Sequence, residues 1–362
     1  MNDTRTTTPA PGAMEHFTIY RNDREFCSWP FNGGMWKLKN EELLVAFVKT
    51  PCDYSVAANL RHTRIETFGK LAAARSSDGG ASWGEPEPIA DQIQLSDDLV
   101  YGKPGNYSTP YDFSDPDTII SCFSTPNTAD PNAKAWIRIS GDGGRNWGPA
   151  VLLPHCQIPR YQGRPSYVVR PDGAILLFLT AKPTHAAYDM PLVFISFTGG
   201  CQWGLFSFMP GSDLYRTICP SPVVLGDGRI AVAVRCKLDV NAVWDELYVS
   251  DDGGVSWSFV SRINDHGDTV HLTAMKDGRL FAIYGFRLHS YGLRAKISED
   301  GGVTWGPEMI IRDDGGSYDL GYPRAVELSD GSILASYYFN DRTDPVQING
   351  GVRYIAGTKL KV

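Results

Sequence analysis

One short motif repeats along this chain of 362 residues and limits its possible folds more than any other feature. The motif reads Ser-x-Asp-x-Gly-x-x-Trp and is called the Asp motif below. Its complete copies begin at Ser76, Ser140, Ser250 and Ser298. A degenerate copy begins at Ser196, where Thr198 takes the place of the aspartate. Consecutive copies start 64, 56, 54 and 48 residues apart, and such a period indicates a repeated supersecondary unit.

The residue types of the Asp motif are those of a hairpin turn. Serine and aspartate side chains bind nearby backbone N–H groups, and glycine adopts the positive φ that tight turns need. The tryptophan offers a large apolar surface for packing between strands. Because such turn residues satisfy one another locally, the motif is expected to be structural rather than catalytic.

A second turn signal runs in phase with the first. Asp-Gly pairs lie between two apolar runs at Asp172, Asp227, Asp277 and Asp330, and each of them reads as a hairpin. In the three complete cases the serine of the Asp motif follows 21 to 24 residues later. Each repeat therefore contains two hairpins, and four strands in a row make one blade of a β-propeller.

The repeats predict an all-β, six-bladed β-propeller. The predicted blades span residues 27–89, 106–153, 163–208, 216–263 and 269–311, with a sixth that begins near Leu320. The sixth blade lacks a fourth strand before the chain ends, and Phe17–Tyr20 is expected to supply it. Closing the ring in this way removes exposed sheet edges. Residues 1–14 are expected to be a disordered tail, and 15–362 a single domain.

Composition excludes several classes of function. The net charge is −7 and no basic cluster stands out, so no nucleic-acid partner is expected. The seven cysteines are odd in number and form no C-x-x-C pair, which indicates neither a disulfide framework nor zinc. No ligand spacing indicates another metal, and no cofactor is expected. The N-terminus lacks a secretory signal and no apolar run reaches membrane length. We therefore expect a cytoplasmic protein with no membrane partner.

Topology predicts which residues face a central pocket. The Asp motif and the Asp-Gly turns share one face of the propeller, so the pocket should open on the other. That face receives the starts of the first strands and the ends of the second strands, where several arginines lie. Arginine suits planar carboxylates because its guanidinium donates two parallel hydrogen bonds. We predict that at least two of Arg164, Arg235 and Arg287 converge near the propeller axis beside acids such as Glu246 or Asp268.

The number and spacing of the Asp motifs resemble those of the sialidase (neuraminidase) superfamily over about residues 15–358. The segments Asp319-Leu-Gly-Tyr-Pro-Arg324 and Tyr284-Gly-Phe-Arg287 are similar to those of bacterial sialidase-like proteins. The resemblance implies a retaining hydrolase of terminal sialic acids. Such enzymes use an arginine triad for the substrate carboxylate, a tyrosine nucleophile assisted by a glutamate, and an aspartate as acid and base.

Carried over residue by residue, the resemblance gives roles to several positions. Arg235 matches the second arginine of the triad, and Arg287 or Arg294 the third. Tyr322 matches the nucleophile, and Asp53 or the stretch from His62 to Glu66 lies where the acid/base loop belongs. Two positions depart from the pattern. Cys27-Ser-Trp-Pro30 replaces the Arg-Ile-Pro of the first blade, and Cys219 stands where the activating glutamate is expected, with Glu246 as a possible substitute.

Three functions fit these residues. The first is a sialidase-like exo-glycosidase for sialic acid or a related acidic sugar, with Tyr322, Asp53, Glu246 and His62 as catalytic candidates. The second is another glycan-cleaving enzyme, a uronate lyase or a rhamnosidase-like hydrolase. The third is a non-catalytic sugar-binding propeller with Trp29 and Tyr107 as stacking platforms. The candidates for substrate binding are Arg164, Arg235, Arg287, Arg324, Trp29 and His271, and the expected partner in each case is a carbohydrate.

Overall fold

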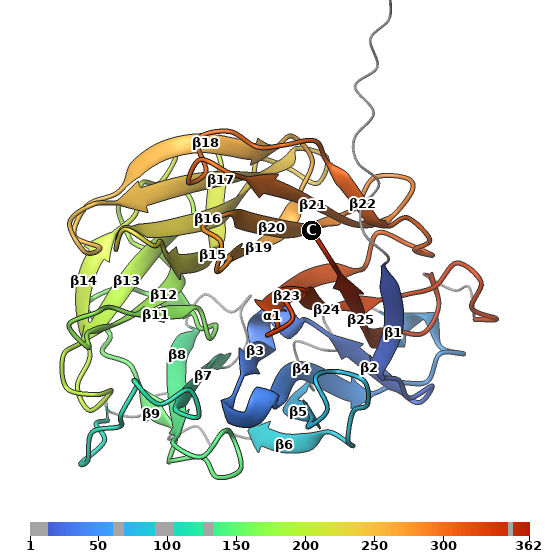
Figure 1. Ribbon diagram of the computed structural model, residues 1–362, viewed down its shortest axis with the longest axis horizontal. Coiled ribbons are helices and arrows are strands. Elements are labelled where there is room, and N and C mark those ends of the chain that lie inside the picture. The colour runs from blue at the N-terminus through green and yellow to red at the C-terminus, as the bar shows by residue number, and fades with distance from the viewer. Residues whose placement is uncertain (1–13, 61–68, 91–104, 126–132, 347–349) are drawn as a thin grey trace, which may run out of the picture.

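Six antiparallel sheets surround a common centre in the computed structural model of this chain (Figure 1). The structure describes residues 14–60, 69–90, 105–125, 133–346 and 350–362. The predicted tail, residues 1–14, lies outside this range except for Met14. Each sheet is one blade, so the six-bladed all-β propeller predicted from the repeats is confirmed. No helix in the described ranges is long and apolar enough to cross a membrane.

Blades four, five and six are four-stranded meanders, numbered outward from the axis. Blade four contains β15 (Arg216–Val224), β16 (Ile230–Lys237), β17 (Val243–Ser250) and β18 (Ser258–Asn264). Blade five contains β19 (Asp268–Ala274), β20 (Leu280–Phe286), β21 (Gly292–Ser298) and β22 (Met309–Arg312). Blade six contains β23 (Gly321–Glu327), β24 (Ile333–Phe339), β25 (Tyr354–Leu360) and β1 (Glu15–Tyr20).

The N-terminal strand completes blade six, as predicted. β1 pairs antiparallel with β25, with Phe17 opposite Gly357 and Thr18 opposite Ala356. A Cβ at position 357 would lie 2.4 Å from the Phe17 ring, so only glycine lets this ring lie flat on the strand. The two ends of the chain thus lie in one sheet, and the ring closes without a free edge in this blade.

Blades one and three have innermost strands that are broken in two. Blade one contains β2 (Glu25–Ser28), β3 (Gly34–Lys37), β4 (Leu43–Pro51), β5 (Lys70–Ser76) and β6 (Glu87–Ala90). Blade three contains β10 (Arg160–Gln162), β11 (Tyr167–Val169), β12 (Ile175–Lys182), β13 (Met190–Ser196) and β14 (Gly204–Phe208). A single helical turn, α1 (Pro30–Gly33), separates β2 from β3, and the 3₁₀ turns η1 (Lys39–Glu41) and η2 (Ala57–Asn59) also lie in blade one.

Blade two differs from the prediction. It contains β7 (Ile119–Thr125), β8 (Lys134–Ser140) and β9 (Val151–Leu152), which are its three strands within the described ranges. The expected first strand at residues 106–108 is not formed there. Instead, Gly105 donates to the Leu152 carbonyl of the outermost strand, and the Tyr107 hydroxyl donates to the Pro149 carbonyl. Tyr107 is buried at the outer part of the blade, so it is not a sugar platform at the pocket.

The Asp motifs form self-satisfied turns that also join neighbouring blades. In blade four, Ser250 Oγ donates to Asp252 at 2.7 Å and accepts from the Gly254 amide at 2.7 Å. Gly254 has φ 98°, which explains the glycine. Trp257 is buried and donates through Nε1 to Ser207 Oγ of blade three at 3.2 Å. The structural interpretation of the motif is therefore supported by its hydrogen bonds.

Candidate functional site

Left-handed residues interrupt the innermost strands where they approach the propeller axis. Cys219 in β15, Thr269 in β19 and Tyr322 in β23 have φ between 49° and 56°, each at a register shift against the second strand of its blade. Trp29, between β2 and α1, has φ 60°. Non-glycine residues rarely adopt this conformation, and β-bulges next to active sites re-aim side chains. The bulges thus turn these four side chains away from the regular strand pattern.

Two predicted arginines converge on one carboxylate. Arg235, near the end of β16, places Nη2 2.8 Å from Asp268 Oδ2 at the start of β19. Arg287, just beyond β20, places Nη1 3.3 Å from the same oxygen. Arg235 and Asp268 are both buried, so this contact lies inside the protein rather than on its rim. The convergence predicted for at least two arginines is therefore present, with Asp268 as the neighbouring acid.

Asp268 is ionised in this setting. Burial by itself would raise the pKa of its carboxyl, but Arg235 and Arg287 outweigh that effect and hold the pKa below its usual value. One carboxylate shared by two guanidinium groups leaves the cluster with a net positive charge. On a protein whose overall charge is −7, such a local excess favours a small anionic ligand.

Tyr322 lies against the same cluster. Arg235 Nη1 donates to the Tyr322 hydroxyl at 3.2 Å, and the Arg287 guanidinium carbon lies 5.4 Å from the centre of the Tyr322 ring. The Trp29 ring centre is 6.1 Å from that of Tyr322. Cys219 belongs to the small apolar cluster against which Tyr322 packs. The predicted nucleophile therefore has two cations as polar neighbours, and a thiol lies in the place expected for a carboxylate.

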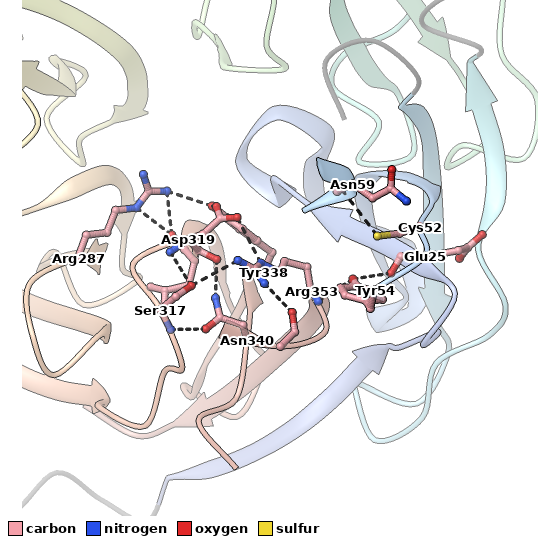
Figure 2. Close-up of polar contacts among 12 residues, drawn as sticks. Glu25, Cys52, Tyr54, Asn59, Arg287, Ser317, Asp319, Tyr338, Asn340 and Arg353 are labelled. Carbon is pink, nitrogen blue, oxygen red and sulfur yellow. Dashed lines mark hydrogen bonds and ion pairs between the residues drawn. The ribbon is translucent and has the colours of Figure 1, made fainter. Parts of the chain in front are cut away.

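A buried network fixes Arg287 in its orientation (Figure 2). Its Nε and Nη2 donate to the Leu320 carbonyl at 3.1 and 2.9 Å, and Nη2 also donates to the Tyr338 hydroxyl at 3.1 Å. Tyr338 in turn donates to Asp319 Oδ1 at 2.7 Å, while Asp319 Oδ2 pairs with Arg353 Nε at 3.2 Å. The remaining nitrogen, Nη1, is thus directed at Asp268. This network spans blades five and six and preorganises the guanidinium.

A cavity of about 440 Å³ lies beside the cluster, between blades four and five. Asp268 and Arg287 contribute to its lining, and Lys237, the last residue of β16, lies with them. The other lining residues are Val240, Asn241, Val243, His266, Gly267, Gly285, Leu288, Tyr291 and Tyr318. The cavity therefore combines a charged part with an apolar and aromatic part, as sites for small ligands commonly do.

Arg164 and Arg324 do not join the Asp268 cluster, contrary to the role expected of them. Arg164 Nε donates to Asn32 Oδ1 at 2.8 Å, and Arg324 Nη2 donates to the Phe31 carbonyl at 2.7 Å. Both arginines are buried and neither forms an ion pair within the described ranges. Each therefore holds the α1 turn, and the reason is that this turn projects from blade one toward the centre.

Phe31 of α1 reaches residues from the opposite side of the propeller. It is fully buried and clusters with Ile218, Cys219 and Tyr322 from blades four and six. Its ring centre lies 6.5 Å from that of His271 in blade five. Figure 1 shows α1 near the middle of the ring. The side chain thus fills space at the axis that the sequence analysis assigned to the ligand.

His271 and Trp29 are less accessible than a substrate-binding role requires. His271 Nδ1 accepts the Ala325 amide of blade six at 3.1 Å, and burial, with Arg324 adding to it, lowers the pKa of His271 well below its usual value. A neutral imidazole that joins two blades is a structural arrangement. Trp29 is 8% exposed, so it offers little free surface for stacking on a sugar.

The expected acids and base lie elsewhere. Glu246 accepts from Trp244 Nε1 at 2.7 Å and from the Tyr248 hydroxyl at 2.8 Å, so both its oxygens are occupied within blade four and neither bonds to Tyr322. Asp53 is exposed and accepts from the amide and hydroxyl of Ser55, which lower the pKa of its carboxyl. His62 lies outside the described residues. The roles proposed for Asp53 and His62 stay predictions.

The sequence analysis missed Lys237 and Arg353. Lys237 follows Arg235 by two residues on the same strand, and this spacing places both side chains on one face of the sheet, which is a usable signal. Arg353 is at a blade junction where the sequence gives no turn or periodicity to place it. Its role became evident only from its contact with Asp319.

A family comparison supports the repeat assignment. The family described as BNR repeat-like domain matches residues 133–334, which is more than half of the chain. The chain belongs to this family. None of the curated proteins matches it by sequence. Membership agrees with the Asp motifs, most of which lie inside the matched segment.

Solved structures share the fold of this BNR repeat-like protein. A protein of unknown function from Dyadobacter fermentans is 25% identical, with 96% of this chain and 98% of that one covered and a TM-score of 0.75. A Trypanosoma rangeli sialidase in complex with sialic acid is 12% identical, with a TM-score of 0.63 and coverage of 97% and 59%. This chain thus spans about 59% of that sialidase.

An arabinanase has a similar fold. The Penicillium chrysogenum α-L-arabinanase complexed with arabinobiose is 13% identical, with a TM-score of 0.62 and coverage of 96% and 97%. Identities this low establish the propeller and nothing finer. The neighbours include glycoside hydrolases, so the fold is one on which glycoside hydrolysis occurs, while function depends on the site that each chain builds.

Proposed function

We propose that this BNR repeat-like protein is a glycoside hydrolase for a terminal acidic sugar, sialic acid or a relative of it. The observation that carries the proposal is the meeting of Arg235, Arg287 and Tyr322, from three blades, beside a cavity of about 440 Å³. The sialidase and arabinanase with the same fold support a carbohydrate substrate. The substrate carboxylate would be held by the net positive charge that remains after Asp268 is counted.

The chemistry that fits these residues is attack by Tyr322 on the anomeric carbon. The carbon–oxygen bond to the leaving group breaks as the bond to the tyrosine oxygen forms, and water later hydrolyses the glycosyl-enzyme. When the tyrosine oxygen departs it carries negative charge. The Arg235 guanidinium 3.2 Å away stabilises that charge, because fixed donors in a water-poor site need no reorganisation.

A second candidate is a sugar-binding propeller without turnover. The specific observation in its favour is that no carboxylate accepts a hydrogen bond from Tyr322 among the residues that the structure describes. Glu246 is bound within blade four, and Asp268 is held ionised by two arginines. A phenol without a base is a weak nucleophile at neutral pH. Binding alone would need only the cations and the cavity.

Turnover assays separate these candidates. The full chain is incubated with a fluorogenic sialoside and with fluorogenic uronides, and binding of the free acids is measured by calorimetry. We expect release of the fluorophore from one acidic glycoside, and a loss of about 100-fold or more in kcat for Tyr322→Phe with binding retained. Tyr188→Phe, at an exposed position on blade three, is the matched control and should act as the wild type.

Each other outcome is informative. Binding of an acid without turnover favours the sugar-binding propeller. Absorbance of an unsaturated uronate without hydrolysis favours a uronate lyase. Release from a neutral glycoside such as a rhamnoside, with no response to acidic ones, would contradict the proposal and favour a rhamnosidase-like hydrolase.

A further inference from the structure

The cavity between blades four and five contains a cation with no assigned role. Lys237 ends β16 and lies on the same face of that strand as Arg235. It is half-buried and lines the cavity with Asp268 and Arg287. Within the described ranges it forms no ion pair and no side-chain hydrogen bond. Burial, and after it the neighbouring Arg235, lower the pKa of the Lys237 amine.

The charges around the cavity do not balance. Asp268 is the one acidic residue in its lining and is shared by Arg235 and Arg287, so Lys237 adds a third cation to a single carboxylate. A cation withdrawn from water without a partner is unfavourable unless an anion joins it. The cavity therefore provides a charged place for a carboxylate from outside.

The mouth of the cavity has the opposite character. Tyr318 is 57% exposed and Val240 80% exposed, and Leu288 and Tyr291 lie between them and the charged residues. Gathered apolar side chains at the rim of a charged pocket commonly mark a ligand-binding site. Tyrosine rings offer a flat apolar face with a polar edge, which suits a sugar ring or an aromatic aglycone.

The axis itself is less open to a ligand. Phe31 fills space there and is fully buried, and Arg324 donates to its carbonyl oxygen at 2.7 Å. Arg164 secures the next residue, Asn32. The cations nearest the axis are therefore engaged in holding α1. Arg287 is the arginine that touches both Tyr322 and the off-axis cavity.

We propose that the acidic sugar binds off the axis, in the crevice between blades four and five, with its carboxylate on Lys237 and Arg287. The group linked to that sugar would pack on Tyr291 and Tyr318 at the mouth. The substrate class is thus an acidic sugar glycosidically linked to a second ring or an apolar aglycone. This inference rests on the proposed function, since it assigns the ligand of the same site.

Calorimetry with matched ligands and variants tests it on the full chain. The probes are N-acetylneuraminic acid, glucuronic acid and the methyl ester of each, which keeps the ring and removes the charge. Lys237→Met should weaken binding of the acid by about 10- to 100-fold, because a charge-assisted bond is lost, and should leave ester binding unchanged. Lys182→Met is the control, since Lys182 ends the second strand of blade three as Lys237 does in blade four.

The aromatic mouth has its own test. Tyr318→Ala should weaken an aryl glycoside of the acid by about 10-fold and leave the free acid unchanged. Thermal melting of each variant checks that it is folded. If the wild type binds the acid and Lys237→Met binds it equally well, the off-axis assignment is wrong while the proposed function stands. If the wild type binds none of the acids, the proposed function fails together with it.

Discussion

Replacing Asp268 by asparagine separates electrostatics from shape at the centre of the site. The side chains are nearly isosteric, but the change leaves the Arg235 and Arg287 guanidiniums without the carboxylate that lies 2.8 and 3.3 Å from them. Removing one partner of a buried ion pair costs about 3–5 kcal/mol of folding free energy. Arg287 retains the Leu320 carbonyl as an acceptor and is partly exposed, so we expect about 3 kcal/mol.

The loss should depend on pH with a definite sign. The pKa of Asp268 is lowered in the folded protein, so its carboxylate stabilises the fold fully above the unfolded pKa of about 3.9. That contribution disappears as the pH falls through the lower folded pKa. Urea unfolding of wild type and Asp268→Asn should therefore differ by the full amount at pH 7, and the difference should shrink once the pH is below about 4.

An anion should restore part of the lost stability. A ligand at 100 times its dissociation constant adds about 2.7 kcal/mol to a folded state that alone binds it. Glucuronate or N-acetylneuraminate should therefore raise the unfolding midpoint of Asp268→Asn more than that of the wild type. Asp265→Asn, in the same loop but 79% exposed, is the control and should change little. Equal stability of Asp268→Asn and wild type at pH 7 would refute the reasoning.

Three further changes test the structural and catalytic assignments. Trp257→Ala should lower the free energy of unfolding by about 3–5 kcal/mol while the folded protein keeps its sugar affinity; unchanged stability with lost affinity would contradict the structural role. Ser298→Ala removes the acceptor of the Gly302 amide, so chemical unfolding should show a loss of about 1–3 kcal/mol. Asp53→Asn should leave stability unchanged and should lower kcat if Asp53 is the acid and base, so an unaltered pH–rate profile would exclude that role.

The fold was predictable because its determinants are local. The Asp motif carries its own hydrogen bonds, from Ser250 to Asp252 and Gly254, and needs no distant partner to form. The Asp-Gly turns behave in the same way. The N-terminal strand was placed by the need to complete blade six. Blade two was mispredicted because Tyr107 finds its partners, Pro149 and Ile139, through tertiary contacts that no turn signal records.

The site was predictable only in part. Strand ends identify which face Arg235, Arg287 and Tyr322 occupy, and their convergence follows from topology. Where each side chain points depends on the backbone at the bulges, and a sequence pattern does not reveal that Cys219 or Tyr322 adopts a positive φ. The same holds for α1, whose insertion turns Arg164 and Arg324 away from the cluster.

The most direct test of acidic-sugar recognition is a crystal structure of the full chain soaked with N-acetylneuraminic acid or glucuronic acid. We expect density for the sugar between blades four and five, with its carboxylate within about 3.2 Å of Arg287 and Lys237 nitrogens and with Tyr322 next to the anomeric carbon. Density for the acid on the opposite face, among the Asp motifs, would contradict this assignment. So would a carboxylate that contacts neither cation.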